Sequence, residues 1–130
     1  MRHDTSKFVR FVVGPDGADH RYLNGVITEA RLLRDDGFLT DHESELLAEV
    51  FTWFNENVPV PPYSKNKWWP KGVAAWFKDD VASEITSKIW DLVAFLREHG
   101  KNVRILRSRN PGEVYYEDEV QIVVSEFPRL

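Results

Sequence analysis

The chain of 130 residues contains no cysteine. This absence excludes disulfide bonds, cysteine nucleophiles, zinc sites built on thiolates and iron–sulfur clusters. Long apolar runs are also missing, because none approaches the roughly 20 residues that a membrane-spanning helix needs, and the first residues lack the apolar segment of a secretory signal peptide. We therefore expect a cytoplasmic protein that does not enter a membrane.

Motifs typical of metal and cofactor sites are missing as well. The four histidines are scattered through the sequence without the spacing of metal ligands. The seven glycines form neither a phosphate-binding loop nor a dinucleotide-binding fingerprint, and the nucleophile elbow of hydrolases does not occur. We therefore expect no bound metal ion and no cofactor.

The size and composition are those of one globular domain covering residues 1–130. Hydrophobic residues make up 42% of the chain and aromatic residues 13%, which is enough to form a single hydrophobic core without crosslinks. The large aromatic share indicates a well-packed interior, an adhesive surface or both. It is compatible with a homodimer, although nothing in the sequence requires one.

The net charge of −4 conceals blocks of opposite sign. Residues 35–56 carry seven acids and no lysine or arginine, whereas residues 57–78 carry four lysines and no acid. Either these blocks neutralise each other across the folded surface, or they give the protein a basic face for an anionic partner. The three-dimensional arrangement decides between the two readings.

The first half of the chain predicts a strand followed by two helices. Residues 7–13 are rich in β-branched and aromatic side chains and precede a glycine–proline turn, so they predict a strand. Asp19 is expected to cap a helix over residues 20–34 that ends at Gly37.

The second helix has the clearest start signal in the sequence. Thr40 and Glu43 match a capping box, and apolar residues then recur at helical spacing as far as Phe54. Three prolines within residues 59–62 exclude regular helix or a central strand there. The long segment from residue 58 to residue 72 is therefore expected to be a loop, and loops of this length are usually functional or disordered.

The second half predicts one more helix among four strands. Residues 73–77 read as a short buried strand, and a helix is expected from Asp79 or Asp80 to about His99. The remaining strands are expected at residues 103–109, 114–116 and 119–125, separated by turns. The order β-α-α-β-α-β-β-β predicts an α+β fold, in which helices cover one face of a mostly antiparallel sheet.

The strongest candidate for a contact surface is the segment 64–78, which contains three of the five tryptophans and four lysines. Its central part, the lysine–tryptophan loop, contains Lys65, Lys67, Trp68, Trp69 and Lys71. Lysines neutralise phosphates and flat rings stack on bases, so the loop has the groups that nucleic-acid binding requires. The structural alternative is that the tryptophans only attach a long loop to the body of the protein.

Arginines on the predicted strand 103–109 form a second basic group. Strand alternation places Arg107 and Arg109 on one face and Arg104 on the other. Arg107 and Arg109 have the geometry to bind a phosphate or carboxylate, but they are equally suited to pair with acids on neighbouring strands.

Residues 115–119 (YYEDE) combine phenols and carboxylates, which permits a catalytic interpretation. In that interpretation Arg107 and Arg109 hold the phosphate of a substrate, Glu117 or Glu119 acts as base, and Tyr115 or Tyr116 orients the substrate. The structural interpretation is that the acids form local hydrogen bonds in a turn.

Four segments taken together resemble a group of small bacterial proteins of about this length that are known mainly as uncharacterised open reading frames. The segments are residues 8–13 (FVRFVV), 53–61 (WFNENVPVP), 75–78 (AWFK) and 111–119 (PGEVYYEDE). The resemblance spans nearly the whole chain and implies a single intact domain. It implies no activity and no functional residue.

From the sequence we therefore expect a small bacterial binding or interaction module without catalysis of its own. Its contact surface is expected to join the lysine–tryptophan loop to strand 103–109, with nucleic acid or another protein as the partner. An enzyme acting on a phosphorylated or nucleotide substrate is the main alternative. A third possibility is that the acidic second helix contacts another protein.

Overall fold

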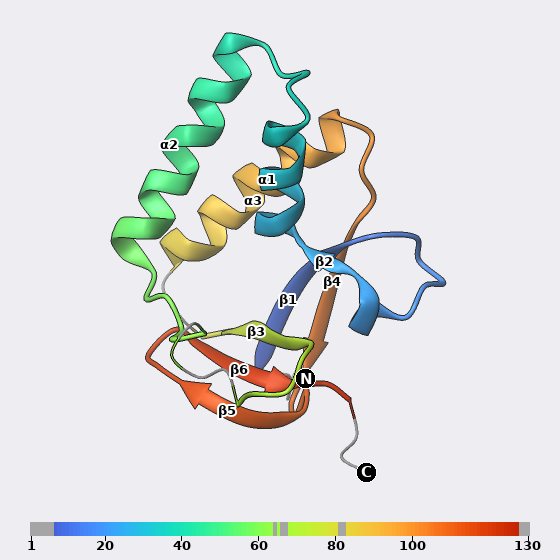
Figure 1. The fold of residues 1–130 in the computed structure, drawn as a ribbon, viewed down its shortest axis with the longest axis vertical. Coiled ribbons are helices and arrows are strands. Elements are labelled where there is room, and N and C mark those ends of the chain that lie inside the picture. The colour runs from blue at the N-terminus through green and yellow to red at the C-terminus, as the bar shows by residue number, and fades with distance from the viewer. Residues whose placement is uncertain (1–6, 64, 66–67, 81–82, 128–130) are drawn as a thin grey trace, which may run out of the picture.

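The computed structural model of the chain describes residues 7–63, 65, 68–80 and 83–127. Its elements are β1 (Phe8–Val13), the 3₁₀ turn η1 (His20–Tyr22), β2 (Asn24–Gly25), α1 (Val26–Asp35), α2 (Asp41–Asn57), β3 (Val73–Lys78), α3 (Ser83–Glu98), β4 (Val103–Ser108), β5 (Glu113–Glu117) and β6 (Gln121–Ser125). The predicted order is confirmed with the short strand β2 added. The chain is a single α+β domain, and in Figure 1 the three helices lie on one side of the sheet.

The start of α1 differs from the prediction. Asp19 does act as a cap, but its carboxylate accepts the Arg21 backbone N–H and thereby caps η1. The chain then extends through β2, which pairs with the end of β1, and α1 begins only at Val26. Gly37 ends α1 as expected, with a φ of +79° that favours glycine.

The capping box at the start of α2 is confirmed. The Glu43 backbone N–H donates to Thr40 Oγ1 at 3.1 Å, and the Thr40 backbone N–H donates to the Glu43 carboxylate at 2.9 Å. The hydrogen bond from the Thr40 backbone is the main cause of a lowered pKa for Glu43. The same carboxylate lies 2.7 Å from His99 Nε2, so it also ties the start of α2 to the residue that follows α3.

The described part of α3 runs from Ser83, and the predicted start of this helix falls on residues 81 and 82, which lie outside the described residues. The Asp79 backbone N–H donates to the Lys7 carbonyl, and the Asp79 carboxylate pairs with Arg107. The two groups of Asp79 join the end of β3 to β1 and β4.

The sheet is antiparallel throughout and strongly curled. One side of β1 pairs with β4 along its whole length, while its other side is shared between β3 at Phe8 and Val9 and β2 at Val12 and Val13. From β3 the sheet continues to β6 and β5. In Figure 1, β1 and β4 run steeply, whereas β3, β6 and β5 turn across the lower part of the view.

The two faces of the curled sheet enclose separate cores. The face toward the helices packs against buried residues such as Leu92, Val93 and Leu96 of α3. Burying each such side chain contributes about 1.5–3 kcal/mol. The concave face encloses a smaller core formed by Phe8, Trp76, Leu106, Ile122 and Val124.

Candidate functional site

The two adjacent tryptophans of the lysine–tryptophan loop have different roles. Trp69 is buried, and its ring centroid lies 6.0 Å from that of Tyr63 and 6.4 Å from that of Tyr116. Trp69 therefore attaches the loop to β5. Trp68 remains 71% exposed, with edge contacts to Trp69 at 6.3 Å and Tyr115 at 6.1 Å between centroids.

The lysines of the loop lie at the surface where the structure describes them. Lys65 and Lys71 are exposed, and Lys71 lines a shallow hollow together with Tyr115 and Gly112. Lys67 lies outside the described residues. The exposed ring of Trp68, supported by Tyr115, is therefore accompanied by at least two exposed ammonium groups.

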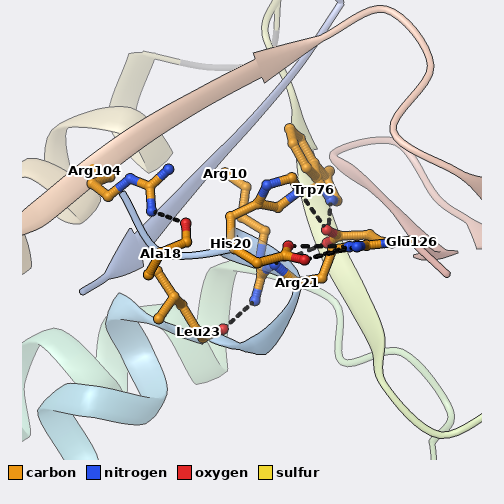
Figure 2. Close-up of polar contacts among 9 residues, drawn as sticks. Arg10, Ala18, His20, Arg21, Leu23, Trp76, Arg104 and Glu126 are labelled. Carbon is orange, nitrogen blue, oxygen red and sulfur yellow. Dashed lines mark hydrogen bonds and ion pairs between the residues drawn. The ribbon is translucent and has the colours of Figure 1, made fainter. Parts of the chain in front are cut away.

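The arginines near β4 do not form one surface. Arg104 lies on the concave side, where its Nη1 donates to the carbonyl oxygen of Ala18 at 2.8 Å (Figure 2). The same nitrogen also donates to the carbonyl oxygen of Pro15 at 3.0 Å. Arg107 lies on the opposite face and pairs with Asp79 at 2.9 Å. Arg109 follows the end of β4, is exposed, and is three residues from Gly112 in the hollow beside Lys71.

Asp118, in the turn after β5, serves the fold. Asp118 accepts the backbone N–H groups of Val120 and Gln121 as well as the Tyr116 hydroxyl. Burial alone raises the pKa of Asp118, but these hydrogen bonds outweigh it and the pKa is lowered. The hydrogen bond between the Tyr116 hydroxyl and Asp118 also raises the pKa of Tyr116.

Glu117 pairs with Lys78 at 2.6 Å rather than with an arginine. Lys78, Asp79 and Glu117 line one shallow hollow, and Arg107 is not among its described lining residues. Each of the two proposed catalytic groups is already neutralised, Arg107 by Asp79 and Glu117 by Lys78. Glu119 is exposed, with no ion pair among the described residues.

A buried charged cluster was not found from the sequence. The Glu126 side chain is 3% exposed and accepts hydrogen bonds from Arg10 Nη1 at 3.1 Å and Trp76 Nε1 at 3.0 Å (Figure 2). Its second oxygen lies 2.8 Å from His20 Nε2, without the alignment of a hydrogen bond. We call Arg10, His20, Trp76 and Glu126 the Glu126 cluster.

The Glu126 cluster fastens the segment after β6 to the concave face of the sheet. Arg10 also donates to the Leu23 carbonyl at 3.3 Å, which adds the chain just before β2 to the same assembly. Burial lowers the pKa of the Arg10 guanidinium, and the Glu126 carboxylate counters that effect. One sequence signal was present: alternation in β1 places Arg10 on the face opposite Val9 and Phe11, inside an otherwise apolar strand.

Within the described part of the chain, no group of three or more histidine or acidic side chains is arranged to hold a metal ion. None of the helices there is both long enough and apolar enough to cross a membrane. No protein-family model matches the chain, and neither the curated proteins nor the solved structures include a match.

Proposed function

We propose that the protein is a binding module that contacts single-stranded nucleic acid through Trp68 and the cations around it. The observation that carries this proposal is the exposure of Trp68, whose ring is 71% accessible while Trp69 beside it is buried. Edge contacts with Trp69 and Tyr115 hold the Trp68 ring in place. A supported and exposed indole is a stacking surface for a base, and such stacking contributes about 1–3 kcal/mol per base.

The charges around Trp68 favour a polyanion over an apolar protein groove. Lys65 and Lys71 are exposed on the same loop, and Arg109 lies close in sequence to the hollow that Lys71 lines. Lys67 belongs to the same loop in the sequence. Each phosphate contact on a single strand adds about −0.7 to the slope of log K against log salt, so three contacts predict a slope of about −2.

The test is a titration of the protein with a labelled oligothymidylate, followed by its anisotropy and by tryptophan fluorescence at several salt concentrations. We expect saturable binding that weakens as salt rises. Trp68→Ala should weaken binding about 5- to 150-fold, the equivalent of 1–3 kcal/mol, and Trp68→Phe should restore part of it. Replacing Lys65, Lys67 and Lys71 with alanine should flatten the salt dependence.

The matched control removes two lysines elsewhere, Lys88→Ala and Lys101→Ala, and should leave the salt slope unchanged. Absence of binding at low salt would overturn the proposal. Binding that is unaffected by Trp68→Ala would remove Trp68 from the contact surface and overturn the proposal in this form. If Trp68 contacts a protein partner instead, Trp68→Ala should abolish binding of that protein and leave binding of the oligonucleotide unchanged.

The enzyme hypothesis has less support from the contacts. It needs Arg107 and Glu117 to face a common substrate, but Arg107 is paired with Asp79 and Glu117 with Lys78. Asp118 lies between the two candidate bases in the sequence, and its carboxylate already accepts the backbone N–H groups of Val120 and Gln121. A substrate would have to displace these pairs.

A further inference from the structure

The middle strand β3 is unusually open on its helix-facing side. It lies between β1 and β6, yet Val73, Ala75 and Phe77 are only partly buried. The pairing of β3 with β1 covers only two positions, Phe8–Lys78 and Val9–Phe77. Beyond them β2 takes the remaining edge of β1, and β3 diverges from β1.

The divergence opens a cleft of about 450 Å³ between the sheet and the helices. Ala74 and Ala75 lie on its sheet side, Phe51 and Phe54 on its α2 side, and Val60 in the segment that follows α2. The small side chain of Ala75, on the helix-facing side of β3, leaves a space that a larger side chain would fill. A cleft of this size with mostly apolar walls is typical of a site for a small molecule.

Backbone groups also face the cleft. The Lys78 N–H donates to Val120 on the β6 side, and the Asp79 N–H donates to Lys7 on the β1 side. By alternation the N–H and C=O groups of Val73 and Ala75 point toward β1, where no described strand pairs with them. They offer hydrogen-bond donors and acceptors to a bound molecule.

The charge of the cleft has one sign. Among the described lining residues the charged ones are Arg10 and Arg31, and none is acidic. The Arg10 guanidinium is already neutralised by Glu126, whereas Arg31 is exposed and lies 5.8 Å from the centroid of the Phe51 ring. Arg31 therefore places a cation at the edge of an apolar wall. The first turn of α1 also lines the cleft and makes it more positive, but the preference for an anion rests on Arg31.

We propose that this cleft binds a small amphipathic molecule with an apolar body and a single anionic group. The apolar body lies between Ala75 and the rings of Phe51 and Phe54, and the anionic group faces Arg31. The site does not involve Trp68 or the lysines of the lysine–tryptophan loop, so it is independent of the proposed nucleic-acid surface.

The test uses 1-anilinonaphthalene-8-sulfonate, whose fluorescence rises in apolar sites, and three competitors with the same decyl chain. We expect one saturable site from which decanoate displaces the probe. Decanol should compete less well and decyltrimethylammonium least. Equal competition by the cationic compound would overturn the charge assignment, and the absence of saturable binding would overturn the site.

Variants locate the site. Ala75→Leu fills the cleft and should weaken decanoate binding roughly tenfold or more without lowering the thermal midpoint. If Ala75→Leu does not fold, Val60→Asp serves instead: Val60 is 73% exposed, and a carboxylate there should repel decanoate.

The role of the Arg31 charge is tested by Arg31→Gln. This variant should weaken the binding of decanoate about two- to fivefold, as expected for an exposed ion pair, and leave the binding of decanol unchanged. The matched control is Arg34→Gln, because Arg34 lies on the same helix and also near the Phe51 ring but does not line the cleft. Equal effects of the two variants, or unchanged binding after both Ala75→Leu and Val60→Asp, would overturn the proposal.

Discussion

Removing the carboxylate of Glu126 tests whether the Glu126 cluster stabilises the fold. In Glu126→Ala the Arg10 guanidinium, whose side chain is 13% exposed, loses its counter-ion and retains its contact with the Leu23 carbonyl. Breaking a buried ion pair by removing one partner costs about 3–5 kcal/mol, because the other charge remains buried and uncompensated. Since Arg10 keeps one hydrogen bond and some contact with water, we expect a loss near the lower limit, about 3 kcal/mol.

Two related variants separate charge from shape. Glu126→Gln keeps the size of the side chain and one acceptor but removes the charge, so its loss should lie between wild type and Glu126→Ala. Replacing both Arg10 and Glu126 with methionine removes the charged pair altogether. Because no buried charge remains, the double variant should be more stable than Glu126→Ala.

The assay is urea unfolding at pH 7, followed by tryptophan fluorescence. With a slope of about 1.5–2 kcal/mol per molar urea, a loss of 3 kcal/mol lowers the midpoint by about 1.5–2 M. His20→Ala should cost less than about 1 kcal/mol, because His20 is 37% exposed and its interaction with Glu126 is screened by water. A loss below 1 kcal/mol for Glu126→Ala, or a double variant as unstable as the single one, would refute the reasoning.

Two further predictions concern the turns around β5. Gly112→Ala should destabilise the fold by more than about 2 kcal/mol, because a Cβ there would lie 2.0 Å from the Ser125 carbonyl oxygen. In the control Gly17→Ala the added Cβ has no atom within 4 Å, so this variant should be neutral in the same urea assay. Equal urea midpoints for the two variants would contradict this prediction. Asp118 has a lowered pKa in the folded protein, so its contribution is present above its unfolded pKa of about 3.9 and is lost as the pH falls through the folded value. The difference in unfolding free energy between wild type and Asp118→Asn should therefore narrow from pH 5 to pH 2, and a constant difference would show that ionisation of Asp118 is not involved.

Local signals in the sequence predicted local structure well. The capping box of Thr40 and Glu43 joins residues three positions apart, and the structure confirms both hydrogen bonds. Asp19 was assigned to the wrong helix, because a capping residue does not show how far the helix that it starts will extend. The short pairing of β2 with β1 interrupts that helix, and strand pairing depends on residues distant in the sequence.

In the candidate site, too, contacts between residues distant in the sequence decide what local sequence signals cannot. Trp68 and Trp69 are adjacent and chemically identical, and only their contacts with Tyr63, Tyr115 and Tyr116 decide which of them is buried. The partners of Arg104 are backbone carbonyls nearly 90 positions away in the chain. Sequence spacing cannot predict such contacts, and the Glu126 cluster was missed for the same reason.

The contacts of the cations explain why the two proposals use different residues. Arg104 and Arg107 were expected from the sequence to contact a ligand, yet Arg104 is held by carbonyl oxygens of the fold and Arg107 by a carboxylate. Arg10 is likewise held by the Glu126 carboxylate. In a protein with a net charge of −4, anion binding falls to cations that remain exposed to solvent. Lys65 and Lys71 are exposed on the same loop as Trp68, and Arg31 lies at the cleft. Loss of the lysines should therefore leave decanoate binding intact, and loss of Arg31 should leave oligonucleotide binding intact, so each proposal can fail without the other.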